Sequence, residues 1–158
     1  MKRRVFCFAV LSCLGVGLLQ AADGFVGTWK LNVAKSTFAK GHEIKDQTVV
    51  IAEQGDNRVV TVKSTDGTGK ATASKYMSPL KGGTVTYTEG APAAGAGAIV
   101  VTKRVDANTT DGTSTLNGKV VRATHTVLSA DGKTLTQSVT YTGDDGKSSK
   151  ATLVMERQ

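Results

Sequence analysis

The side chains with the clearest capacity for chemistry are two histidines and a pair of adjacent aspartates. His42 stands beside Glu43, His125 lies far along the chain between two threonines, and Asp144-Asp145 precedes a glycine. A zinc site needs ligands at close local spacing, and a serine hydrolase typically needs a nucleophile on a Gly-x-Ser-x-Gly turn. The sequence has neither pattern, and an Asp-Asp-Gly segment is typical of a hairpin turn. We therefore predict no enzyme, no catalytic residue, no metal site and no cofactor.

A second set of residues suits recognition of a ligand rather than its transformation. Arg122, Lys103 and Gln137 each occupy an alternate position in a β-like segment, on the face that carries apolar residues. Tyr87 and Tyr141 lie on faces of the same kind and are expected either in the core or in a binding wall. A buried charge is costly unless it is paired, so an inward Arg122 or Lys103 predicts an anionic group, such as a carboxylate, on the ligand. The alternative is a position at a rim in water, or a register one residue away, which reverses every face.

The N-terminus is typical of a secretory signal peptide. A basic Lys2-Arg3-Arg4 is followed by the apolar residues 5–19 and by Ala21-Ala22, where a leader peptidase would cut. We predict a signal peptide over residues 1–21, a mature domain over residues 22–158, and export to the periplasm or the medium. A membrane anchor is the less favoured alternative, because it needs about 20 apolar residues. A lipoprotein signal at Cys13 is a second alternative.

Both cysteines and three of the basic residues belong to this predicted leader. Without Cys7 and Cys13 the mature chain has no disulfide, and its core alone must hold it together. The whole chain has 20 Lys and Arg against 13 Asp and Glu, a net charge of +7, which falls to +4 without the leader. Because the remaining lysines are scattered singly, we predict no nucleic-acid partner. We expect a monomer with no membrane span in the mature chain.

The elements that must position these residues are short strands. Valine and threonine alternate with other residues in about ten segments at near-regular spacing, a pattern typical of antiparallel β-proteins. Asn117-Gly118 and Asp131-Gly132 are tight-turn signals between two such segments each. The only helix expected is a turn or two within residues 33–40. The predicted strands cover residues 27–32, 47–53, 58–63, 71–77, 84–88, 99–105, 113–116, 120–128, 135–142 and 151–156.

Antiparallel strands in sequence order leave two exposed edges, and closure into a barrel removes them. The predicted fold is all-β: a single antiparallel up-and-down barrel of about 8–10 strands. Threonines and serines occupy the expected outer face, which argues against an outer-membrane barrel. The expected inner face is apolar and consists of Trp29, Leu31, Val85, Tyr87, Leu135, Val139, Tyr141, Leu153 and Met155.

The first strand carries Gly27-x-Trp29, which resembles the signature of lipocalins and their calycin relatives. This resemblance implies that Trp29 closes one end of the barrel and that a basic residue near the end of the last strands packs across its ring. Arg157 is the first candidate for that role and Arg104 the second. Attraction between a guanidinium and the indole face supplies the physical reason.

A closer resemblance covers nearly all of the mature chain. The segment Phe25-Val26-Gly27-Thr28-Trp29-Lys30-Leu31-Asn32, with the later segments 105–109 and 129–136, is similar to a family of small exported bacterial lipocalin-like proteins without an established activity. The short additional motifs of well-studied lipocalins are not evident here. We therefore expect a non-enzymatic barrel that binds or carries a small, partly apolar or amphipathic molecule. The alternative is a filled barrel that acts as an envelope or extracellular interaction protein through its surface.

Overall fold

The computed structural model describes residues 23–158. The predicted leader, with its cleavage site and both cysteines, lies outside these residues. Among residues 23–158, no helix has the length and apolarity that a membrane crossing requires.

The described chain is built almost entirely of β-strands, as predicted, with one 3-10 turn after the first strand (η1, Val33–Lys35). The turn lies within the stretch where a short helix was expected. The strands are β1 (Gly27–Leu31), β2 (Ile44–Gln54), β3 (Asn57–Asp66), β4 (Ala71–Pro79), β5 (Gly82–Thr84), β6 (Thr86–Glu89), β7 (Ile99–Arg104), β8 (Thr109–Leu116), β9 (Lys119–Leu128), β10 (Thr134–Thr142) and β11 (Ser148–Arg157).

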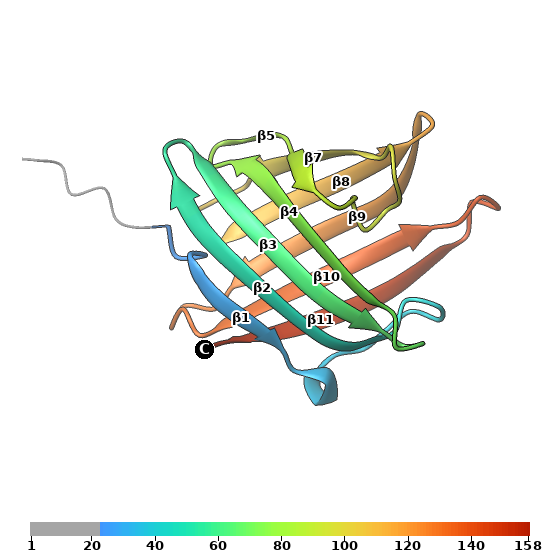
Figure 1. Cartoon of the computed structure of the whole chain (residues 1–158), viewed down its shortest axis with the longest axis horizontal. Helices are drawn as coiled ribbons and strands as arrows, with labels where there is room; N and C mark the ends of the chain where they lie inside the picture. The colour runs from blue at the N-terminus through green and yellow to red at the C-terminus, as the bar shows by residue number, and fades with distance from the viewer. Residues whose placement is uncertain (1–22) are drawn as a thin grey trace, which may run out of the picture.

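All eleven strands belong to one antiparallel sheet that curves into a barrel (Figure 1). Successive strands are neighbours along the wall, and the last strand, β11, pairs with the first, β1. This is the predicted up-and-down connection. Because consecutive strands of the wall run in opposite directions, the chain has two sets of loops, one at each end of the barrel.

The barrel closes through a strand that is split at Val85. β5 pairs with β7 on one side, whereas β6 pairs with β4 on the other. Between them, the amide of Val85 donates to the carbonyl oxygen of Val100 at 2.8 Å, and its buried side chain points into the core. β5 and β6 are therefore two halves of one wall strand, which explains eleven strands where about ten were expected.

The inward faces predicted for most strands are confirmed. Trp29, Leu135, Val139 and Leu153 are all at least 97% shielded from solvent, and the threonines that flank Val85 are exposed. The buried core gathers mainly on β1, β2, β10 and β11. Hydrophobic burial of this kind provides most of the stabilisation of a domain without disulfides.

The face predicted for β7 is wrong. Lys103 lies on the outer wall and is exposed together with Ile99 and Val101, whereas Thr102 and Arg104 alternate with them on the inside. The cause is that this strand is apolar on both faces, so its sequence does not define a register. The inward polar side chains of β7 have hydrogen-bond partners. The hydroxyl of Thr102, for example, lies 3.1 Å from the hydroxyl of Ser78.

A bulge in β9 determines where Arg122 points. Ser114 pairs with Arg122, but the next residue of β8, Thr115, pairs with Val120, which leaves Val121 as an extra residue. Val120 is consequently half exposed on the outer wall. Strict alternation along residues 120–128 would instead place Val120 on the inner face with Arg122. Bulges commonly re-aim side chains in this way.

Candidate functional site

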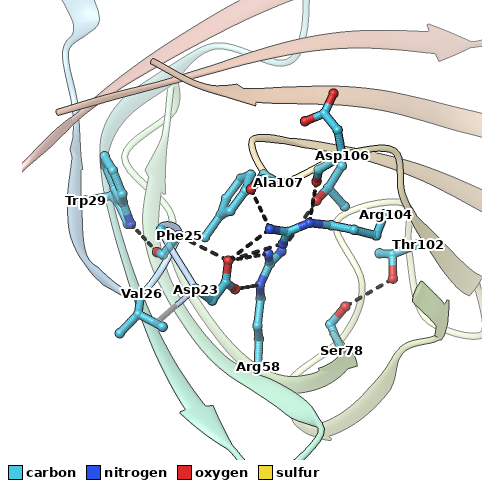
Figure 2. Close-up of polar contacts among 12 residues, drawn as sticks. Asp23, Phe25, Val26, Trp29, Arg58, Ser78, Thr102, Arg104, Asp106 and Ala107 are labelled. Carbon is cyan, nitrogen blue, oxygen red and sulfur yellow. Dashed lines mark hydrogen bonds and ion pairs between the residues drawn. The ribbon is translucent and has the colours of Figure 1, made fainter. Parts of the chain in front are cut away.

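One end of the barrel, here called the plugged end, is closed by the N-terminal segment, residues 23–26. The Asp23 carboxylate contacts two arginines, Arg58 on β3 and Arg104 on β7 (Figure 2). Its Oδ1 accepts from Arg58 Nη2 at 2.9 Å and from both terminal nitrogens of Arg104 at 3.2 Å. Both guanidinium carbons also lie over the ring of Phe25, at 4.2 and 5.0 Å from its centroid. Two positive charges thus face one carboxylate, which leaves this end of the interior with a net positive charge.

The Gly-x-Trp segment lies beside the plug. The Arg157 guanidinium stacks on Trp29 with its carbon 4.2 Å from the ring centroid. Arg157 also donates three hydrogen bonds of 2.6 Å to the carbonyl oxygens of Gly24, Val26 and Gly132. The indole nitrogen of Trp29 donates to the carbonyl oxygen of Phe25, in the N-terminal segment, at 2.9 Å. The second candidate for the stacking role, Arg104, lies on the ring of Phe25 instead.

Glycine is required at position 27 for two reasons. Its φ of 147° lies in a region that L side chains rarely adopt. A Cβ at Gly27 would also collide with Nη1 of Arg157. The glycine of the motif therefore makes room for the cation that covers the tryptophan.

The interior of the barrel contains a cavity of about 220 Å³. Part of its wall is apolar and includes Ile51, Val60, Val62, Leu135 and Met155. A cavity of about 150 Å³ already accommodates a benzene-sized molecule, so the space is sufficient for a small ligand.

The polar part of the cavity wall is organised around Arg122. Its Nη2 donates to Oε1 of Gln137 at 3.4 Å, and Gln137 in turn donates to the hydroxyl of Thr126 at 3.0 Å. Among residues 23–158, no carboxylate lies within ion-pair distance of Arg122. An unpaired interior cation attracts an anionic group, because a charge removed from water is stabilised by an opposite one.

Two buried side-chain atoms in the described residues have no hydrogen-bond partner, and both belong to residues that line this cavity. One is Nε of Arg122, a donor, and the other is Oε1 of Gln47, an acceptor on β2. Buried polar atoms are nearly always paired, so each exception in a native structure needs an explanation. Both atoms are covered by neighbouring protein atoms, so the parts of Arg122 and Gln47 that line the cavity are other parts of the two side chains.

Two tyrosines add hydroxyl groups to the cavity wall. The rings of Tyr76 and Tyr87 lie with their centroids 4.9 Å apart. Burial raises the pKa of the Tyr76 phenol, and Tyr87 raises it further, while the positive charge of Arg122 acts in the opposite direction. Burial also raises the pKa of Tyr87. Both side chains therefore present neutral hydroxyls at neutral pH.

A second, more open pocket of about 390 Å³ lies at the other end of the barrel, here called the rim. Tyr141 and His42 form part of its wall, with their rings stacked at 3.8 Å between centroids and 7° between planes. Lys147 of the β10–β11 turn lines it as well. Arg122 and Ala93 line both the rim pocket and the interior cavity, so the two spaces meet at Arg122.

The residues singled out from the sequence are thus only partly brought together. Arg122, Gln137 and Tyr87 line the interior cavity, Tyr141 lines the rim pocket, and Lys103 lies on the outer wall. Sequence reasoning missed Gln47, Tyr76 and Arg58. A signal existed for Arg58, because it alternates with Val60 and Val62 in the same way as Arg122 alternates with its neighbours.

The remaining groups with catalytic potential are on the outer surface. His125 Nδ1 lies 2.7 Å from Oδ1 of Asp111, and Ser138 is the cross-strand neighbour of His125 on its other side. These are the residue types of a hydrolase triad. However, strands β8, β9 and β10 pair with one another over this stretch, so their amides are used in the ladder and do not form an oxyanion site. In the described part of the chain, no three His, Cys, Asp or Glu side chains come together as a metal site would require.

Comparison with known proteins extends the description of the fold. No family model matches the sequence, and no curated protein is significantly similar to it. The structure is similar to that of zebrafish ileal bile acid-binding protein, solved in complex with cholic acid, with a TM-score of 0.50. The two share 12% sequence identity over 85% of this chain and 99% of that one, so the likeness is one of fold. The closed antiparallel barrel and this comparison together show that the chain has a calycin-like fold.

Proposed function

We propose that this protein is exported and binds a small, partly apolar anion inside its barrel, without transforming it. The observation that carries the proposal is the position of Arg122, a cation in the wall of an interior cavity with no carboxylate partner in the described chain. The apolar wall provides a site for the rest of the ligand, as is usual in small-molecule pockets.

Two further observations support this function. Arg122 lines both the cavity and the rim pocket, so an anionic group bound there lies close to the surface while an apolar tail extends inward. In addition, a protein of the same fold was solved with an organic acid, cholic acid. Export is supported by the basic, apolar and small-residue order of residues 1–22.

Native mass spectrometry of the mature protein, purified gently from its own host, is the direct test. We expect a co-purifying molecule that is lost on denaturation. Binding of the fluorescent anion anilinonaphthalene sulfonate then measures the site in solution. In Arg122→Met, affinity should fall at least about tenfold, the usual effect of losing a hydrogen bond to a charged group.

Lys103→Met is the matched control, because it removes one positive charge from the outer wall and leaves the cavity unchanged. Its affinity for the probe should equal that of the wild type. A clean apo mass together with no probe binding would instead indicate a filled barrel and would contradict the proposal.

A second candidate function is interaction with another macromolecule through the outer wall. It is favoured by three exposed aliphatic residues on β7 and β9: Ile99, Val101 and Val120, with exposed fractions of 59%, 44% and 49%. Ile99 and Val120 are both cross-strand partners of Thr115, so they lie in one row. Contiguous exposed apolar residues often mark a contact surface. Substitution of Ile99 by lysine would then reduce capture of a partner without changing probe binding in the cavity.

A further inference from the structure

The guanidinium of Arg122 has little hydrogen bonding to hold it in place. Its one hydrogen bond within residues 23–158 runs from Nη2 to Oε1 of Gln137 and is long, at 3.4 Å. No carboxylate of the described chain forms an ion pair with it. An arginine side chain has many rotamers, and fixing one of them on binding costs part of the affinity. A contact that orients Arg122 before the ligand arrives therefore strengthens binding of an anion.

The ring of Tyr141 provides such a contact. Arg122 on β9 and Tyr141 on β10 are cross-strand partners. The guanidinium carbon lies over the ring, 5.9 Å from its centroid, which is within the range of a cation–π contact. Gln137 and Tyr141 occupy the same face of β10, on either side of the buried Val139. One face of this strand therefore supports the guanidinium at two points.

The ring of Tyr141 is in turn covered by His42. The two rings are nearly parallel, with 7° between their planes and 3.8 Å between their centroids. His42 belongs to the segment between η1 and β2, whose backbone is bonded on both sides of this residue. Thr37 bridges to β11, and the carbonyl oxygen of Glu43 accepts from the amide of Gly67 at 2.7 Å. An anchored segment thus holds the imidazole against Tyr141, although His42 is an exposed residue.

We infer that Tyr141 and His42 are positioning residues of the binding site, and that their stacked rings hold the Arg122 guanidinium where the interior cavity meets the rim pocket. The inference rests on the proposed function and concerns the orientation of its cation. Without the stacked rings, the long side chain can turn toward the water of the rim, where an anion gains less from it because water screens the charge. The rings therefore act on recognition of the anionic group and not on the apolar part of the ligand, which lies against the aliphatic wall of the cavity.

Two fluorescent probes separate the charge from the rest of the ligand. Anilinonaphthalene sulfonate and N-phenyl-1-naphthylamine have the same aromatic skeleton, and only the first carries a sulfonate. The ratio of their dissociation constants measures the preference for the anion, and binding of the neutral probe shows that the cavity is intact. The wild-type mature protein should prefer the sulfonate, and Arg122→Met should abolish that preference.

The variants of Tyr141 test the role of its ring. In Tyr141→Leu the preference for the sulfonate should fall about three- to fivefold, the effect of losing one cation–π contact, while the affinity for the neutral probe stays within about twofold of wild type. Tyr141→Phe keeps the ring and should keep the preference. If Tyr141→Leu binds neither probe, the variants of the exposed His42 decide alone.

The variants of His42 test whether stacking is what this residue supplies. His42→Ala should lower the preference for the sulfonate at least about twofold, because the ring of Tyr141 loses its neighbour. His42→Phe restores a ring that has no positive charge and should retain the preference. His125→Ala is the matched control, since it removes an exposed histidine from the outer wall, and it should behave as the wild type.

A preference for the sulfonate that is unchanged in Tyr141→Leu or in His42→Ala would overturn the inference and leave the proposed function intact. An equal loss in Tyr141→Phe and Tyr141→Leu would also overturn it, because the hydroxyl and not the ring would then be responsible. Absence of binding, or equal affinities of the wild type for the two probes, would instead count against the proposed function and, with it, the inference.

Discussion

The carboxylate of Asp23 and the guanidinium of Arg58 form an ion pair at the plugged end of the barrel, with only 7% and 9% of their side chains exposed. The two residues are separated by 35 positions in the sequence and join the N-terminal segment to β3. Arg104 contacts the same carboxylate from β7. Asp23 therefore ties the plug to two strands of the wall at once.

Neutralising this carboxylate should be strongly destabilising. In Asp23→Asn, both arginines lose the carboxylate with which they pair, and breaking a buried pair in this way costs about 3–5 kcal/mol. Urea unfolding of the mature protein should show this loss in the free energy of unfolding. Asp56→Asn, at an exposed turn position, is the control and should unfold at the wild-type urea concentration. Equal midpoints for both variants would contradict a structural role for the plug.

Trp29 should be the most costly side chain of β1 to truncate. It is fully buried, covered by Arg157, and bonded to the Phe25 carbonyl. We expect Trp29→Ala to lower the free energy of unfolding by about 3–5 kcal/mol, since a large cavity replaces the ring. Thermal unfolding followed by far-ultraviolet circular dichroism measures the effect. Retention of the wild-type melting temperature would disprove this account of the Gly-x-Trp segment.

Gly27→Ala combines a collision with Arg157 with strong backbone strain. Both Gly27 and Gly55 have positive φ values, 147° and 57°, but a Cβ at Gly55 meets open space. Gly55→Ala should therefore show only the cost of strain, about 1 kcal/mol. Gly27→Ala should cost a further amount of about 1–3 kcal/mol, because alanine adopts its φ less readily and the added methyl displaces the guanidinium. Similar melting temperatures for the two variants would show that Arg157 moves aside freely.

Tyr76 should make the protein sensitive to alkali. Because the folded pKa of its phenol is raised above the ordinary value of 10.0, the unfolded chain loses this proton first as the pH rises. The stability that Tyr76 contributes is thus fully present below about pH 10 and is lost progressively above it. Melting temperatures measured from about pH 8 to about pH 11 should fall less steeply in Tyr76→Phe than in the wild type. Parallel curves would indicate that the phenol ionises equally easily in both states.

Prediction from the sequence succeeded for strands whose aliphatic residues all lie on one face. On β10, Leu135 and Val139 alternate with Thr136 and Ser138, so the inner face, and with it the position of Gln137, followed directly from the pattern. It failed on β7, where Ile99, Val100 and Val101 are all apolar. A strand with apolar residues on both faces has two equally acceptable registers. The outward position of Lys103 is the consequence.

The polar residues of the barrel interior could be predicted only in part from the sequence. Arg122 was expected to face inward, but the bulge that separates it from Val120 leaves no local mark in the sequence. Gln47 was overlooked because an isolated glutamine in a strand is normally a surface residue. Its place in the cavity wall appears only once the barrel is assembled.

By itself, the amino-acid sequence determined the all-β class, the up-and-down order of the strands and most of their inward faces. These features depend on the alternation of apolar and polar residues and on the residues of tight turns. Both can be recognised within a single short segment of the sequence. Only the tertiary structure decided that Asp23 meets Arg58, that Arg122 lacks a carboxylate, and that Gln47 shares its cavity. These relationships join strands far apart in the chain, and closure of the barrel sets the distances between them.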